Sequence, residues 1–262
     1  MARTPDGPPP PPPVQRLRLR YAKRGRLRFS SHRDFQRALE RALRRAGVPM
    51  AYSAGFNPHP KISYANAAPT GAASEAEYVE LAVAQRCDPA KVRAALDESL
   101  PDGLDVVDVV EVRSGSLADR LEASEWLVRL PGVPQAAVDA AAATYLAAPS
   151  VEVQRLTKSG LRTIDTRLAV VTLDRGDGTA AARLTEGGEG DCAILRVVVR
   201  HGDPDQGIPS VRPDDVINGL RLVAGLAPQA APEVTRLAQG PLDLATVRVG
   251  DPLAADRDAP AV

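Results

Sequence analysis

Hydrophobic and polar positions near the start of the chain follow first a two-residue period and then a helical one. Residues 14–21, VQRLRLRY, alternate apolar and arginine side chains, which predicts a half-buried strand with one cationic face. After a turn, Ser31 and Asp34 resemble a helix capping box, and apolar residues recur at helical spacing until Gly47. The opposite face of this predicted helix carries Arg33, Arg37, Arg41, Arg44 and Arg45.

The segment up to residue 114 completes a defined order of elements. It continues with the stretch AYSAGFNPHPKISY, a strand-like EYVELAVAQ, a helix in DPAKVRAALDESL and a strand in LDVVDVVEV. Because the first stretch leads into a strand, the order is strand, helix, strand, strand, helix, strand. That order is typical of a ferredoxin-like unit, in which both helices cover one face of an antiparallel sheet.

The second half of the chain has a similar succession. EWLVRLP and AILRVVVRH are strand-like, QAAVDAAAATYLAA and RPDDVINGLRLVAGL are helix-like, and residues 151–175 indicate extended structure. The halves share no obvious residue identity, so the predicted repeat is architectural. We therefore expect an α+β protein of two tandem ferredoxin-like (βαββαβ) units with antiparallel sheets, at 14–114 and 122–247.

The two ends differ from these units in composition. Residues 1–13 are rich in proline and predict a disordered or polyproline II leader, and residues 248–262 predict a disordered tail. No apolar run approaches the roughly 20 residues that a membrane span needs, and the start lacks the apolar core of a signal peptide. We expect a cytoplasmic protein without a membrane partner.

The cysteines exclude several kinds of cofactor chemistry. Cys87 and Cys192 lie far apart, which favours two small buried residues in a reducing compartment over a disulfide. The sequence has no CxxC pair, no His and Cys at zinc spacing and no cysteine triad for an iron-sulfur cluster. We expect no metal site and no cofactor in this chain.

Charge is unevenly distributed although the formal net charge is zero. Residues 15–61 contain thirteen Lys and Arg and two acidic residues, a balance of +11, and residues 62–262 carry a balance of −11. This asymmetry predicts a basic face near the N-terminus that could meet an anionic partner. Arg16, Arg18 and Arg20, on one side of the first strand, would belong to that face.

The stretch AYSAGFNPHPKISY combines turn-forming and ligand-type residues. Pro58 and Pro60 hold His59 on a stiff loop, which suggests a binding role. Lys61 could contact phosphate or be a solvated charge, and Phe56 could stack on a base or anchor the loop. The same two alternatives apply to Tyr52 and Tyr64.

The remaining candidates are less specific. His32 lies beside a helix N-cap, where a histidine is either solvated, capping or functional, and His201 precedes a predicted surface turn. Asp165 and Arg167 in TIDTR predict a local ion pair on a strand. No motif specifies a nucleophile together with its base.

The run RLRFSSHRDFQRALERALRRAGVPMAYSAGFNPHPKISYANAAPTGAASEAEYVEL, residues 26–81, resembles the opening of the radical SAM-linked proteins, a family of unknown function. KSGLRTIDTR, residues 158–167, is similar to that family's second-half motif. Members follow a cobalamin-binding radical SAM enzyme as a domain or occur as separate chains. The resemblance therefore implies a separate radical SAM partner, but it brings no established catalytic role for Ser31, His32 or Asp34.

Three hypotheses remain open from the sequence. The favoured one is an accessory binding module that presents RNA or another polyanion to a radical SAM enzyme, in RNA modification or processing. The alternatives are a metal-free endoribonuclease that uses His32 and His59 as acid and base, and a structural adaptor. Whether the protein is an enzyme is left undecided, although no catalytic pair is visible. The candidate substrate-binding residues are Arg16, Arg18, Arg20, Ser31, His32, Arg33, Ser53, Phe56, Asn57, His59 and Lys61.

Overall fold

The computed structural model describes residues 10–113, 115–157, 160–176, 192–228 and 230–258. The chain forms two compact units, which we call unit 1 (residues 1–119 and 252–262) and unit 2 (residues 120–251). The fold is mixed α/β, and its sheets are mostly antiparallel. None of the helices in the described part of the chain has the length and apolar character that crossing a bilayer requires.

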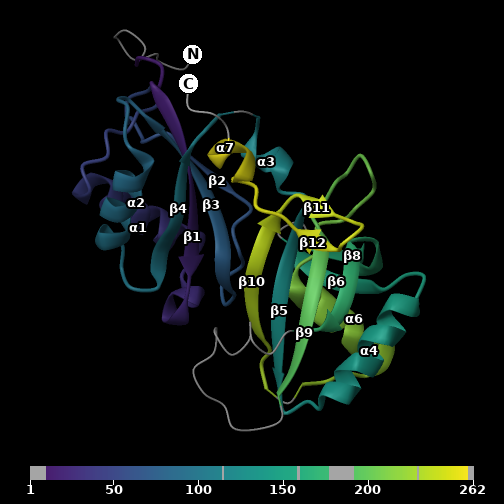
Figure 1. The fold of residues 1–262 in the computed structure, drawn as a ribbon. Coiled ribbons are helices and arrows are strands. Elements are labelled where there is room, and N and C mark those ends of the chain that lie inside the picture. The colour runs from purple at the N-terminus through teal and green to yellow at the C-terminus, as the bar shows by residue number, and fades with distance from the viewer. Residues whose placement is uncertain (1–9, 114, 158–159, 177–191, 229, 259–262) are drawn as a thin grey trace. The chain divides into compact units, whose positions relative to one another are not determined.

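Unit 1 contains a four-stranded antiparallel sheet in the order β4-β1-β3-β2. Its strands are β1 (Gln15–Lys23), β2 (Ile62–Ala65), β3 (Ala73–Val83) and β4 (Leu104–Glu111). Its longer helices are α1 (His32–Arg45) and α2 (Pro89–Ser99), and its short ones are η1 (Gly25–Phe29), α3 (Leu117–Arg120) at the unit boundary and α7 (Ala254–Arg257). Figure 1 shows α1 and α2 on the same side of these strands.

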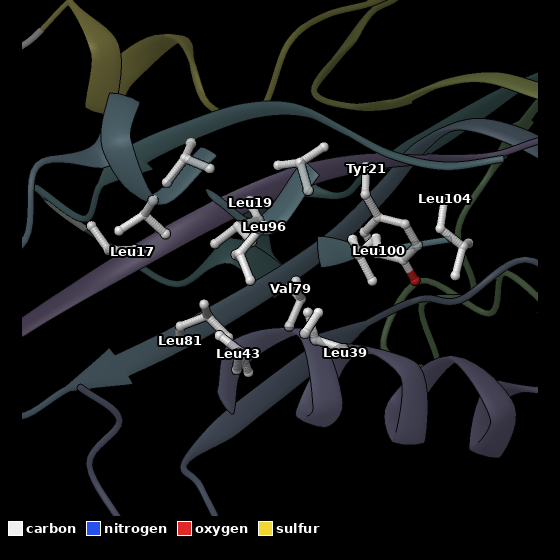
Figure 2. Packing of buried hydrophobic residues seen from close by; sticks show 14 of the residues in the cluster. Leu17, Leu19, Tyr21, Leu39, Leu43, Val79, Leu81, Leu96, Leu100 and Leu104 are labelled. Carbon is white, nitrogen blue, oxygen red and sulfur yellow. The ribbon is translucent and has the colours of Figure 1, made fainter. Parts of the chain in front are cut away.

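Periodicity explains how this core forms. Leu17 and Leu19 project from the helix-covered face of β1, and the arginines between them project from the other face, which we call the open face. In Figure 2, Leu39 and Leu43 of α1 point toward the leucines and valines of the strands. Each such leucine gains about 1.5–3 kcal/mol from leaving water, so the alternation in VQRLRLRY fixes which face of β1 is buried.

In unit 2, antiparallel strands pair in the order β10-β5-β9-β8. Its strands are β5 (Ala123–Pro131), β8 (Val170–Arg175), β9 (Cys192–Arg200) and β10 (Glu233–Gly240). The helices α4 (Gln135–Ala147) and α6 (Pro213–Ala224) pack together. The smaller elements are the pairs β6 (Glu152–Thr157) with β7 (Gly160–Asp165) and β11 (Leu242–Asp243) with β12 (Arg248–Val249), and η2 (Thr166–Leu168).

The close approach of α6 to its neighbours requires a glycine. A Cβ atom on Gly219 would lie 2.7 Å from the Tyr145 ring and 2.9 Å from Val151. Tyr145 is fully buried, and its hydroxyl group lies 2.6 Å from the hydroxyl oxygen of Thr166. Larger side chains at position 219 would therefore push α6 away from α4.

The C-terminal segment is ordered, in contrast to the predicted tail from residue 248. Residues 248–249 form β12, and α7 packs in unit 1 with Leu253 and Asp256 buried. Periodicity could not reveal this because α7 is only four residues long. Residues 1–9 of the predicted leader and residues 259–262 of the tail lie outside the described residues.

Candidate functional site

The arginines of β1 do not form a free cationic face. Arg18 is only 1% exposed, and its guanidinium group lies 2.7 Å from Asp256 and 3.1 Å from Glu80. It also donates a hydrogen bond to the backbone oxygen of Gly115, at 2.6 Å. A buried guanidinium with these partners serves the fold and is not available to a ligand. The prediction of a wholly cationic, solvent-facing strand is therefore wrong at Arg18.

Acidic residues of β3 also engage other arginines near β1. The Nε atom of Arg20 donates to the backbone oxygen of Glu75 at 2.8 Å. Arg24 pairs with the carboxylates of Glu75 and Asp105, and the hydrogen bonds that Arg24 donates to Glu75 are the main cause that raises the pKa of Arg24. The local balance of +11 thus overstates the available charge, because acids from later residues fold back onto the strand.

Two predicted residues meet on the open face of the sheet. Arg16 and Lys61 line a hollow of about 330 Å³ together with Ser63 and Glu80. Ile62 and Tyr64 pack against the core, so Lys61 and Ser63 face the other way by strand alternation. The Arg16 guanidinium lies 3.6 Å from Glu80, which partly compensates its charge.

The stretch AYSAGFNPHPKISY forms a closed hairpin-like loop. The backbone N–H of Ser53 donates to the His59 carbonyl at 2.8 Å, and the His59 N–H donates to the Ser53 hydroxyl at 3.0 Å. Gly55, with φ of 134°, accommodates the bend at the tip. Phe56 is 67% exposed, and Asn57 and His59 are exposed beside it. Ser53 closes the loop, and the loop presents the other three residues to solvent.

The start of α1 is fixed by Ser31 and Asp34. The Asp34 N–H donates to the Ser31 hydroxyl, and the Ser31 N–H donates to the Asp34 carboxylate at 3.0 Å, which confirms the predicted capping box. The hydrogen bond from the Ser31 side chain is the main cause that lowers the pKa of Asp34. Ser31 therefore has a structural role whether or not a ligand binds nearby.

His32 contacts an aromatic residue that follows the loop. Its ring meets the Tyr64 ring edge-on, with 4.8 Å between centroids, and its Nε2 atom lies 3.0 Å from the Gln36 amide nitrogen. Burial raises the pKa of Tyr64 to about 12, with a smaller contribution from the charge of Glu40. In the described part of the chain, no ring contact or hydrogen bond joins His32 to His59. The acid and base pair required by the endoribonuclease alternative is therefore not assembled by direct contact.

One set of exposed cations lies along a single face of α1. Arg33, Arg37, Arg41 and Arg44 are exposed, and none of them forms an ion pair within the described residues. We call these four residues the arginine row. Arg45, which the sequence groups with them, instead donates to the backbone oxygen of Ser99 at 3.1 Å.

Phe29 was not identified from the sequence as a candidate. It is 60% exposed just before α1, and the Arg28 guanidinium lies 4.8 Å from the centroid of its ring. An exposed aromatic residue beside an arginine suits stacking on a base. The signal that could have found it is its mostly polar surroundings in RLRFSSH, where Arg28 and Ser30 flank it directly.

His201 of unit 2 is not on a surface turn. Its Nδ1 atom lies 2.6 Å from the Leu121 carbonyl oxygen, so Nδ1 carries the proton, and Nε2 accepts from the Ser124 hydroxyl at 2.6 Å. The pKa of His201 is lowered to about 4, mainly by burial and partly by the nearby charge of Arg236, while the hydrogen bond with Leu121 opposes this shift. Ser124 is also buried, so the pair stabilises the fold and is not an accessible nucleophile.

Asp165 and Arg167 do not form the predicted ion pair. Asp165 caps η2 by accepting from the backbone N–H of Arg167 at 3.0 Å and also accepts from Val151 at 2.9 Å. The Arg167 guanidinium donates to the carbonyl oxygens of Leu146 and Val170. Both side chains thus hold the backbone around η2.

Comparison with known proteins assigns the family. The matching family model is described as "Uncharacterized protein conserved in bacteria (DUF2344)" and covers residues 16–207. The chain belongs to this family. No curated protein matches it. Among solved structures, a chain of the "Crystal Structure of a Cbf5-Nop10-Gar1 Complex" has 13% sequence identity and a TM-score of 0.44, with 90% of this chain and 55% of that chain covered.

The DUF2344 match includes all the candidate site residues in unit 1. It ends at residue 207, so α7 and the Asp256 partner of Arg18 lie beyond it. The family description names no function and no partner. The link to radical SAM enzymes remains a prediction from the resemblance of residues 26–81.

Proposed function

We propose that unit 1 is a binding module for single-stranded RNA and that the arginine row of α1 contacts the phosphates. The observation that carries this proposal is a contrast between two sets of arginines. Arg18 and Arg24 have carboxylate partners, whereas the four arginines of the row face solvent without ion pairs in the described part of the chain. The row is thus a cationic surface that is available to an anionic partner.

Helix geometry makes this surface linear. Arg33, Arg37 and Arg41 are four residues apart, so their Cα atoms rise about 6 Å from one to the next along the axis. Like charges at this spacing destabilise a helix by about 0.2–0.5 kcal/mol per pair. A bound polyanion would offset this repulsion, because each guanidinium group would be attracted to a phosphate.

Exposed aromatic residues add a second kind of contact. Phe29 precedes α1, and Phe56 lies at the tip of the loop. Aromatic rings beside cations suit stacking on unpaired bases, which favours single-stranded over double-stranded RNA. In this proposal His59 acts as a polar contact near the same ligand and not as part of a catalytic pair, whereas Lys61 lies in the hollow on the open face and takes no part.

A second part of the proposal concerns the fold of the two units. We propose that each unit is ferredoxin-like, since the orders β4-β1-β3-β2 and β10-β5-β9-β8 both suit a βαββαβ chain path.

In unit 1, Asp256 of α7 bonds to Arg18 on the open face. This contact supports binding through the helix-covered side, in contrast to RNA-binding domains that use an open sheet face. Presentation of the RNA to a separate radical SAM enzyme remains part of the proposal on the resemblance alone.

A pair of charge-matched variants tests the proposal. R37A/R41A removes the middle of the arginine row, and R175A/R221A removes two exposed arginines of unit 2. Fluorescence anisotropy with a labelled single-stranded RNA at fixed salt should show weaker binding for the first variant and nearly unchanged binding for the second. Equal effects of the two variants would indicate non-specific attraction and overturn the assignment to α1.

A protein pull-down separates the adaptor alternative from RNA binding. If unit 1 serves only as an adaptor, R37A/R41A should retain every protein partner and the wild type should capture no RNA. Under the proposal, the wild type captures RNA and R37A/R41A loses it.

A further inference from the structure

Unit 2 contains a cavity that the proposed function does not use. Its volume is about 510 Å³, and it lies between the β6–β7 hairpin and the loop of residues 202–210. This size falls within the range of about 300–1,000 Å³ that small-molecule sites occupy. The lining residues include Arg155, Arg162, Ile164, Asp165, Leu168 and Ile208.

Two arginines face each other across the hairpin on one wall. Arg155 and Arg162 are direct cross-strand partners in the register of β6 and β7. Arg155 is held by Asp215 at 2.7 Å and by the Ser210 carbonyl at 3.1 Å. Arg162 is exposed and forms no ion pair among the described residues. Since like charges directly opposite destabilise a hairpin, Arg162 is placed to receive an anionic group.

The rest of the wall combines one carboxylate with apolar side chains. Asp165 lines the cavity, and the hydrogen bonds that it accepts from Val151 and Arg167 both use Oδ1 and not Oδ2. On this wall Ile164 is largely buried and Leu168 is exposed, and the largely buried Ile208 adds an apolar side chain from the opposite loop. This wall therefore offers an acceptor for hydroxyl groups and an apolar surface for a flat ring.

The loop that forms the opposite wall is preorganised. Asp203 and Ile208 exchange backbone hydrogen bonds at 2.8 and 2.9 Å, and the Asp203 carboxylate accepts from the N–H of Asp205 at 3.0 Å. A Cβ atom on Gly202 would lie 2.9 Å from the backbone nitrogen of Ser210, so the two loop ends are in close contact. Such a loop requires little ordering when a ligand binds.

We propose that this cavity binds a nucleoside monophosphate. Arg162 pairs with the phosphate, Asp165 accepts from the sugar hydroxyls, and the base lies against Ile164, Ile208 and Leu168. The ligand is either a free mononucleotide or the terminal nucleotide of an RNA, since both have this chemistry. The inference is independent of the arginine row, because all the lining residues belong to unit 2.

Isothermal titration calorimetry with the full chain tests this site. Adenosine and uridine monophosphates are titrated beside the two nucleosides and inorganic phosphate, and we expect the monophosphates to bind most tightly. R162A should weaken that binding by about ten- to a hundred-fold, because a charge-assisted bidentate pair is lost. R162K should have an intermediate effect, and the exposed strand variant R175A should have none.

The two sources of the nucleotide are separated in the R37A/R41A background. In this background, a short RNA with a terminal phosphate should displace the bound mononucleotide if the cavity accepts the end of an RNA strand. If the RNA does not displace it, the ligand is the free mononucleotide. Absence of binding by either monophosphate, or equal binding by wild type and R162A, would overturn the inference. Neither result would affect the RNA proposal for unit 1.

Discussion

Arg18 depends on a partner 238 positions further along the chain, Asp256. Removing this aspartate would leave a buried guanidinium without its shortest ion pair, so we expect D256A to lower the free energy of unfolding by about 3–5 kcal/mol. Urea denaturation measures the change. D258A, at an exposed position just after α7, is the matched control and should stay within about 0.5 kcal/mol of wild type. Equal midpoints for D256A and wild type would contradict the structural role of Arg18.

His201 predicts a pH dependence of stability. Burial lowers its pKa to about 4 in the folded state, below the ordinary value of 6.5, so the unfolded chain binds more protons between these values. The free energy of unfolding should be unaffected by His201 above pH 6.5 and should fall by up to about 3 kcal/mol as pH decreases toward 4. Urea denaturation across this range should show a shallower fall for H201Q. Parallel curves for H201Q and wild type would contradict the assignment.

Single residues were the hardest feature to anticipate from the sequence. Arg18 and Arg37 have the same formal charge, but one is buried against Asp256 and the other is exposed on α1. The difference arises from acidic residues that are distant in sequence. The alternation of apolar and polar side chains along a strand does not indicate where those residues lie. The buried hydrogen bonds of His201 were missed for the same reason, because its partners Leu121 and Ser124 precede it by about 80 residues.

The helix α1 is the element whose position matters most for the proposed function. Its N-terminus is fixed by the reciprocal bonds of Ser31 and Asp34, so S31A should lower the free energy of unfolding by about 1 kcal/mol. S150A, at an exposed position in a loop, is the comparison and should have little effect. Urea denaturation gives both values. A change no larger than that of S150A would show that the capping box contributes little.

Most strands and longer helices could be predicted because their hydrophobic residues recur with a clear two-residue or helical period. The alternation in VQRLRLRY matches β1, and helical spacing after Ser31 matches α1. The exceptions are short elements. The helix α7 forms because Leu253 and Asp256 become buried in unit 1, which is a tertiary effect that a local pattern does not contain.

The chain as a whole divides into two compact units. The boundary between residues 119 and 120 falls between the predicted segments 14–114 and 122–247. The return of residues 252–258 to unit 1 was not expected, because nothing in the tail composition indicates its partner. The cavity of unit 2 was also missed, since it is formed by segments about 40 residues apart that have no shared motif.

The account assigns separate tasks to the two units. In these proposals, unit 1 offers a polymer the arginine row, which has no ion pair among the described residues, and unit 2 offers a single nucleotide the pocket beside the β6–β7 hairpin. Variants in one unit should therefore leave the ligand affinity of the other unchanged, apart from long-range charge effects that salt screens. This separation allows each proposal to fail without the other.

The salt dependence of RNA binding by the wild-type chain tests whether the arginine row holds the RNA. If the four arginines of α1 each release one counterion equivalent from single-stranded RNA, log affinity should fall against log salt concentration with a slope of about −2.8. R37A/R41A should have a slope of about −1.4 in the same anisotropy titrations. A slope near zero for the wild type, or the same slope for both proteins, would contradict binding through the arginine row.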